Sequence, residues 1–149
     1  MVFDIIVSGD FMEITTKGRY AVRIIADIAR NEGYVSANDI ATRQQISAKY
    51  LEKIVGMLSK AKLVESMRGA TGGYKLAKKP EEISVKDVLD ATDDSIKIST
   101  CLDNDVCPIA DKCDTIGVWN TLNTIINNYL ESVTLKDLID QTCERKIVK

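Results

Sequence analysis

The sequence of 149 residues contains no histidine, so the commonest general base of enzymes and a frequent metal ligand are both missing. The chain also lacks a nucleophile placed beside a base. Its glycines do not stand between a strand and a helix, as phosphate-binding or dinucleotide-binding motifs require. We therefore predict that the protein is not an enzyme and that it has no small-molecule substrate.

Long apolar runs are absent as well. No run approaches the roughly 18 residues of a membrane span, and the first ten residues lack the basic region of a signal peptide. With 45% hydrophobic and 28% charged residues, the composition is that of an ordinary globular protein. We expect a cytoplasmic protein without a membrane partner, and in that compartment closely spaced cysteines more often bind metal than form disulfides.

Charge is distributed unevenly along the chain, although the net charge is only -2. Residues 12–80 carry thirteen Lys and Arg against six Asp and Glu, whereas residues 81–149 carry seven against fourteen. A basic half joined to an acidic half predicts that the first half meets a polyanion such as double-stranded DNA. The alternative is a chance imbalance on a solvated surface.

Helical periodicity is clear in the basic half. Apolar spacing predicts a helix from Tyr20 that ends at Gly33, and a capping-box signal at 36–39 begins a short helix through about Arg43. Ser47 is a candidate cap for a third helix, which buries Leu51, Ile54, Val55 and Leu58. Two short helices joined by a tight turn are typical of a helix-turn-helix arrangement.

A β-hairpin is predicted directly after these helices. Residues 63–67 and 74–77 read as strands, and the glycine-bearing segment 68–73 reads as their turn. A hairpin in this place is a wing, and an arginine at its tip, Arg68, suits a narrow minor groove. The alternatives are a plain hairpin turn and a solvated side chain.

The acidic half contains a long predicted helix between two short ones. A capping box at 84–87 begins the first, and another at 134–137 begins the last. The helix from about Thr115 to Thr134 carries a broad apolar stripe, which a partner helix from a second chain would cover. Packing within the chain is the alternative.

The expected fold is therefore mainly α with a small β-hairpin wing (α+β), a winged helix-turn-helix domain followed by a long dimerisation helix. We expect six segments: a flexible N-terminal extension (1–11), the winged DNA-binding domain (12–80), a connecting helix (81–100), a cluster-binding loop (101–114), the dimerisation helix with a short C-terminal helix (115–140), and a tail (141–149).

Three of the four cysteines, Cys101, Cys107 and Cys113, stand at two equal intervals in a loop-like stretch. Fe–S clusters are normally held by cysteine thiolates, and the positive end of the helix after Cys113 favours the thiolate form. The spacing predicts an iron–sulfur cluster that a loop wraps. Zinc, free reduced thiols and a thiol–disulfide switch remain alternatives.

These segments together resemble the IscR/NsrR/CymR family of bacterial winged helix-turn-helix transcription regulators. The shared motifs lie at 16–22, 46–52, 63–74 and 133–138, and the resemblance spans roughly residues 12–140. It implies a homodimer that binds an operator through the helix-turn-helix and the wing.

The resemblance also implies which residues meet DNA. Lys17 and Tyr20 would contact phosphates, and Arg68 with Gly69 would lie at the minor groove. The major-groove face would be formed by Ser47, Lys49, Glu52 and Lys53. A carboxylate such as that of Glu52 can accept a hydrogen bond from cytosine N4, so this residue can discriminate between operators.

The cysteine spacing is most similar to that of IscR-like members, which implies a [2Fe-2S] cluster and control of iron–sulfur cluster assembly genes. The chain departs from them at Ile116, where they have a histidine ligand. Candidates for the fourth ligand are Asp111, Asp114, Cys143, a residue of the partner chain, or an exogenous thiol or water. The alternatives are a nitric-oxide or redox sensor with a [4Fe-4S] cluster, zinc or free thiols, and, more remotely, a small electron-transfer protein.

Overall fold

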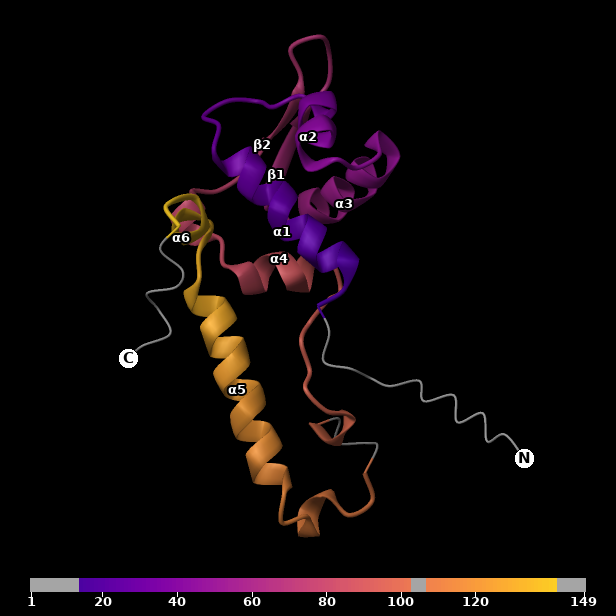
Figure 1. The fold of residues 1–149 in the computed structure, drawn as a ribbon, viewed down its shortest axis with the longest axis vertical. Coiled ribbons are helices and arrows are strands. Elements are labelled where there is room, and N and C mark those ends of the chain that lie inside the picture. Colours follow the sequence, from indigo (N-terminus) through magenta and orange to yellow (C-terminus); the bar gives the residue numbers. More distant parts are fainter. Residues whose placement is uncertain (1–13, 103–106, 142–149) are drawn as a thin grey trace, which may run out of the picture.

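Three helices form the first part of the computed structural model, which describes residues 14–102 and 107–141. They are α1 (Thr16–Ala29), α2 (Ala37–Gln44) and α3 (Ala48–Lys60) (Figure 1). A hydroxyl caps the start of each helix: Thr15 accepts from the Gly18 amide, and Ser36 and Ser47 accept from the amides three residues ahead. These local bonds explain why the three helices start where they do.

The wing is a two-stranded antiparallel hairpin of β1 (Val64–Met67) and β2 (Gly73–Leu76). The turn end of β2 is tied to the segment before α2, because the amides and carbonyls of Val35 and Tyr74 exchange hydrogen bonds of 2.9 and 2.8 Å. A Cβ atom at Gly73 would lie 2.1 Å from the Val35 carbonyl oxygen, so this close approach requires glycine.

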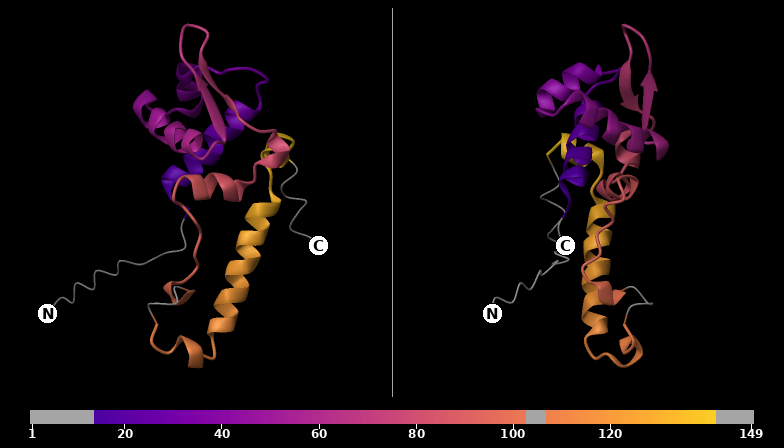
Figure 2. Two further views of the ribbon diagram at one scale, coloured as in Figure 1. Left: turned by 180° about the vertical axis from the view of Figure 1, so that it is seen from behind. Right: turned by 90° about the vertical axis from the view of Figure 1, so that its right-hand side faces the viewer.

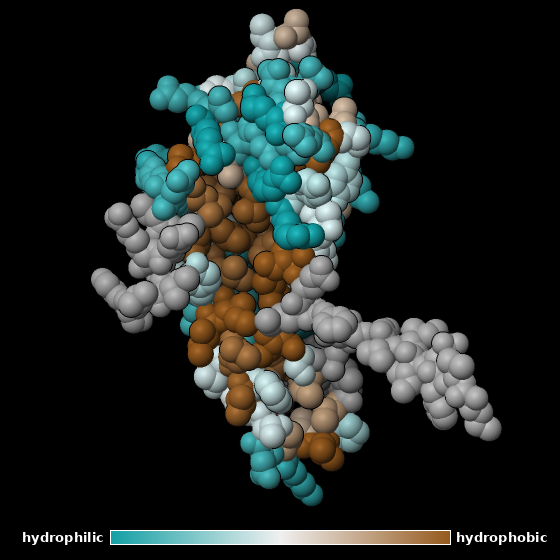
Figure 3. Space-filling view, viewed as in Figure 1, coloured by the Kyte–Doolittle hydropathy of each residue, from teal (hydrophilic) through white to brown (hydrophobic). Residues whose placement is uncertain are grey.

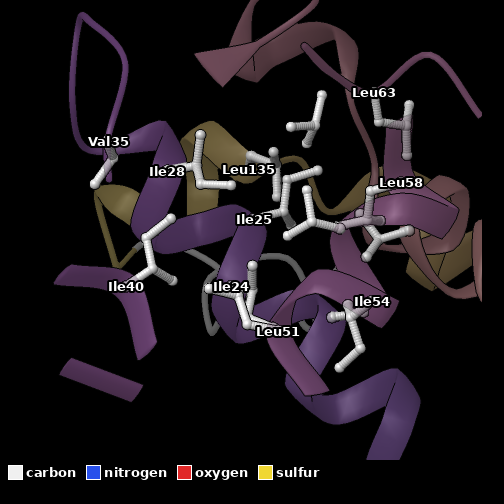
Figure 4. Close-up of a cluster of buried hydrophobic side chains, with 14 of the residues drawn as sticks. Ile24, Ile25, Ile28, Val35, Ile40, Leu51, Ile54, Leu58, Leu63 and Leu135 are labelled. Atoms are coloured by element: carbon white, nitrogen blue, oxygen red, sulfur yellow. The ribbon is translucent and has the colours of Figure 1, made fainter. Parts of the chain in front are cut away.

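A single hydrophobic core holds the helices of this winged part together (Figure 4). Burial of each aliphatic side chain contributes about 1.5–3 kcal/mol. The C-terminal helix α6 joins this core through Leu135, and Leu138 packs against it partly buried. The fully buried side chains include Ile24, Ile25, Ile28, Ile40, Leu51, Ile54, Leu58 and Leu135.

In its described residues, the second part of the chain contains three helices and three short 3-10 turns. A short antiparallel contact, in which the Val85 amide bonds the Val133 carbonyl at 2.8 Å, places the starts of α4 and α6 side by side. From there α5 projects away from the winged part, so the molecule is elongated (Figures 1 and 2). The elements are η1 (Pro80–Glu82), α4 (Val85–Ala91), η2 (Thr100–Leu102), η3 (Ala110–Lys112), α5 (Ile116–Ser132) and α6 (Leu135–Ile139).

The structure confirms the expected fold class, a mainly helical chain with a two-stranded hairpin. Two predicted boundaries of α1 are wrong. The helix begins at Thr16, before the predicted Tyr20, because Thr15 caps it. It ends at Ala29, where the Arg30 amide bonds the Asp27 carbonyl, so Gly33 lies in the following loop. Among the described residues, no helix is long and apolar enough to cross a membrane.

Candidate nucleic-acid interface and cysteine loop

Helix α3 presents the residues expected at the major groove. Lys49, Glu52 and Lys53 are exposed, whereas Leu51, Ile54, Val55 and Leu58 of the same helix are buried in the core. The helical period separates these two sets onto opposite faces. The structure therefore presents a charged face of α3 to solvent, with Ser47 at its N-terminal end.

A groove of about 650 Å³ separates α3 from the wing. Glu52 lines it from the helix, and Arg68 and Gly69 line it from the tip of the hairpin. Gly69 has φ 111°, a left-handed conformation that disfavours other residues, and its carbonyl accepts from the Gly72 amide at 3.1 Å. This turn places the exposed Arg68 on the side of the groove opposite α3.

Tyr74 of β2 also lines this groove. Burial raises the pKa of its phenol, and the negative charge of Glu52 raises it further. Glu52 and Tyr74 thus face the same groove from α3 and from β2. The sequence analysis did not single out Tyr74 as a site residue.

Helix α1 contributes a basic and aromatic cluster that contacts α2 and α3. The rings of Tyr20 and Tyr50 meet edge to face with centroids 5.9 Å apart, and the Arg23 guanidinium lies 4.9 Å from the centre of the Tyr20 ring. Arg23 also donates to the side chain and to the carbonyl of Gln44, each at 3.1 Å. These contacts orient the Tyr20 ring. The sequence analysis did not name Arg23 as a residue of this cluster, although its spacing of three from Tyr20 places the two side chains on one face of the helix. Lys17 is half-buried in the first turn.

The described residues of the cysteine loop, from η2 with Cys101 to the start of α5, lie at the far end of the molecule (Figure 1). Cys101, Cys107 and Cys113 are half-buried and free of disulfides. A hydrogen bond with the Thr115 hydroxyl, 3.3 Å from the sulfur, holds the pKa of the Cys113 thiol below its usual value. The donor set is therefore suited to a soft metal ion or an iron–sulfur cluster.

The geometry of a metal site is not assembled in the described ranges 14–102 and 107–141. No group of three or more His, Cys, Asp or Glu side chains there is placed to hold a metal ion. Asp111 and Asp114 are exposed, and Ile116 begins α5 without a ligating atom. Cys143, another candidate ligand, falls outside the described residues.

Helix α5 carries the apolar stripe that the sequence predicted. None of its side chains is fully buried. Figure 3 shows hydrophobic surface running down the molecule where α5 projects. Ile125 is 58% exposed, and the other large exposed side chains of the stripe are Val118, Trp119 and Leu122. A surface of this kind marks a site for interaction with another protein surface.

Comparison with known proteins agrees with this architecture. The Rrf2 family, described as "Iron-dependent Transcriptional regulator", matches residues 14–141. The transcriptional regulator IscR of Aliivibrio salmonicida is 41% identical over 130 residues, which cover 86% of this chain and 77% of the relative.

Two solved structures share both sequence and fold with the chain. CymR, the global cysteine regulator of B. subtilis, matches with a TM-score of 0.74 at 34% identity, over 89% of this chain and 99% of that one. IscR of T. potens matches with a TM-score of 0.70 at 35% identity, over 92% and 93%. Since these relatives are transcription regulators, the prediction that the protein is not an enzyme is confirmed. The chain belongs to the Rrf2 family and is a winged-helix transcription regulator similar to IscR.

Proposed function

We propose that the protein is a homodimeric regulator that senses iron–sulfur cluster status through a [2Fe-2S] cluster and controls iron–sulfur cluster assembly genes. The observation that carries this proposal is the placement of Cys101, Cys107 and Cys113 in one loop of a regulator of the Rrf2 family. When bound, the cluster supplies a redox-sensitive and iron-sensitive centre. The chain's own residues then read the operator and hold the dimer together.

Operator binding is assigned to the exposed face of α3 and to the wing. Lys49 and Lys53 supply positive charge beside the major groove, and Glu52 selects for cytosine N4. Arg68, at the tip of a turn that Gly69 makes possible, enters the minor groove. Lys17 and Tyr20 hold phosphates from the first turns of α1, and the Ser47 hydroxyl, which caps α3, lies at the same surface.

Dimerisation is assigned to α5. The stripe that contains Leu122 and Ile125 is exposed in the single chain, and a second copy of α5 is the natural cover for it. This pairing would place two winged parts in one particle, as recognition of two operator half-sites requires.

The fourth cluster ligand must replace the missing histidine. Asp111 and Asp114 are exposed near Cys113, so either carboxylate can turn towards a metal without a cost from burial. Cys143 is the third candidate within the chain. A carboxylate ligand is harder than a thiolate or an imidazole, and the resulting cluster would be more labile.

The test is purification without oxygen, followed by an absorption spectrum and iron, sulfide and zinc analysis of the same sample. We expect a brown protein with about two irons and two sulfides per chain. About four of each would favour a nitric-oxide sensor, for which the missing histidine is the supporting observation. A colourless protein that stays empty after reconstitution would overturn cluster sensing and leave zinc or free thiols.

A further inference from the structure

We propose that Asp94 is the positioning residue through which the cysteine loop controls the phosphate-binding turn of α1. This inference rests on the proposed function and deepens it. Asp94 follows α4 and precedes the segment 95–100, here called the strap, which leads to Cys101. Its carboxylate accepts hydrogen bonds from Thr15 at the start of α1, the helix whose first turns contain Lys17 and Tyr20.

The contact between Asp94 and α1 consists of two hydrogen bonds to one oxygen. The amide and the hydroxyl of Thr15 both donate to Asp94 Oδ2, each at 3.0 Å. The same hydroxyl accepts from the Gly18 amide at 3.2 Å and so caps the helix. Asp94 is 8% exposed, and a carboxylate at a helix N-terminus is favourably placed towards the positive end of the helix dipole.

Close packing makes this contact sensitive to small displacements. A Cβ atom at Gly18 would lie 2.0 Å from Asp94 Oδ2 and 3.0 Å from a methyl carbon of Leu89, so no side chain separates the two segments. Asp93 adopts φ 54°, and the Asp94 amide bonds the Leu89 carbonyl at 3.0 Å. This turn at the end of α4 directs the carboxylate towards α1.

The strap is attached on its other side to the projecting helix. Asn127 of α5 donates from Nδ2 to the Ile96 carbonyl at 3.3 Å, and the Ser95 hydroxyl donates to Asp90 of α4 at 2.9 Å. At its end, the Cys101 amide donates to the Ser99 hydroxyl at 3.1 Å. Figures 1 and 2 show the strap running between the winged part and the cysteine loop beside α5.

These contacts form a continuous path from Cys101 to the DNA-binding surface. The strap is six residues long and joins Asp94 directly to Cys101, so the backbone links the position of one residue to that of the other. Fixing Cys101 holds Asp94 against Thr15 and orders the first turn of α1. Releasing Cys101 frees that turn, and the phosphate contacts of Lys17 and Tyr20 are then formed at a greater entropic cost.

The test compares full-length wild type with Asp94→Ala and with the matched pair Thr15→Ser and Thr15→Val. Operator duplexes are first selected by the wild-type protein from random DNA. Dissociation constants are then measured for protein reconstituted with iron and sulfide and for the same protein after chelation. Amide hydrogen exchange of residues 16–20 is followed in both states, which gives a readout that does not depend on DNA.

We expect the wild-type ratio of the two dissociation constants to be of the order of tenfold, within the range of about 5–150-fold typical of coupled sites. Asp94→Ala and Thr15→Val should bring this ratio to within about twofold of one and abolish the difference in exchange, because each removes the link. Thr15→Ser keeps the hydroxyl and should keep both effects.

A purely structural role for Asp94 would weaken both states equally and leave the ratio unchanged, which would overturn the inference while the proposed function stands. If Asp94→Ala fails to fold, the comparison of Thr15→Ser with Thr15→Val decides. If the two dissociation constants of the wild type are equal, cluster sensing itself is overturned, and with it the proposed role of Asp94.

Discussion

The guanidinium of Arg43 donates hydrogen bonds to the carboxylate of Asp27, with Nη2 2.6 Å from Oδ1 and Nε within 3.2 Å of both oxygens. Gln44 donates a further bond of 2.6 Å to the same carboxylate. The pair joins the last turn of α1 to the last turn of α2. Asp27 is buried, so its charge depends on these donors, and the relative placement of the first two helices depends on the pair.

Arg43→Ala should lower the free energy of unfolding at neutral pH by about 1–3 kcal/mol, because it leaves the buried carboxylate with fewer donors. Burial opposes ionisation of Asp27, but the bonds from Arg43 and Gln44 outweigh it and hold the pKa of the carboxyl below its ordinary value of 3.8. The contribution is therefore present above that value and is lost as the pH falls through the lower folded pKa.

Urea denaturation of wild type and Arg43→Ala at pH 7 and near pH 2.5 measures this effect. The difference in unfolding free energy should be large at pH 7 and should shrink in acid. Lys86→Ala, which breaks an exposed ion pair with Asp90, is the matched control and should change little at either pH. Equal differences at both pH values for Arg43→Ala would contradict the assignment.

Two helical glycines should respond to alanine in opposite directions. Gly18→Ala should destabilise the fold by about 1–3 kcal/mol, because its Cβ would meet Asp94 Oδ2 at 2.0 Å. Gly56→Ala should stabilise it by up to about 1 kcal/mol, because nothing lies within 4 Å of the added carbon and alanine favours the helix. Thermal melts of both variants check this, and a neutral Gly18→Ala would mean that α1 and Asp94 do not pack as described.

Ile125→Asp should weaken the dimer that we propose. Ile125 is 58% exposed in the single chain, and a second α5 packed over it would bury the new charge without a partner. Sedimentation equilibrium should show a dissociation constant raised at least tenfold, or about 1.4 kcal/mol. Asn120→Asp, at an exposed polar position of the same helix, is the control and should leave the dimer intact. A dimer unaffected by Ile125→Asp would exclude this face of α5 as the dimer interface.

The phenol of Tyr74 should titrate above its ordinary pKa of 10.0, first because the residue is half-buried and second because Glu52 is near. Glu52→Gln should lower this pKa without restoring the ordinary value, since burial remains. Ultraviolet titration, with Tyr74→Phe to identify the signal, measures both. The raised pKa implies stability that is complete below pH 10 and is lost as the pH rises through the folded pKa. An unchanged Tyr74 pKa in Glu52→Gln would show that the charge of Glu52 does not act on Tyr74.

Arg68→Ala should weaken binding to operators with an A·T-rich flank by about 1–3 kcal/mol, because the wing would lose its minor-groove contact. Arg68→Lys keeps the charge and should keep most of the salt dependence. Binding titrations with A·T-rich and G·C-rich flanks compare the two variants. Equal losses on both flanks would show that Arg68 only neutralises phosphate.

Much of the architecture could be predicted because its signals are local in the chain. Hydroxyls such as those of Ser47 and Ser84 accept from amides three residues ahead, and these bonds mark helix starts at any position in a fold. The glycines at 72 and 73 mark the hairpin because a Cβ atom added at either position would lie only 2.1 Å from a backbone carbonyl oxygen. Where α1 begins was misjudged, since Tyr20 belongs to the apolar face but the cap lies five residues earlier at Thr15.

The sequence by itself therefore determined the order of the helices, the wing, the charged face of α3 and the cysteine spacing, since periodicity and caps operate over a few residues. Only the tertiary structure decided which distant groups meet. Thr15 and Asp94 are 79 residues apart, yet they share two hydrogen bonds. The charge of Glu52 contributes to the raised pKa of Tyr74. Such pairs are created by packing in three dimensions, and no local pattern records them.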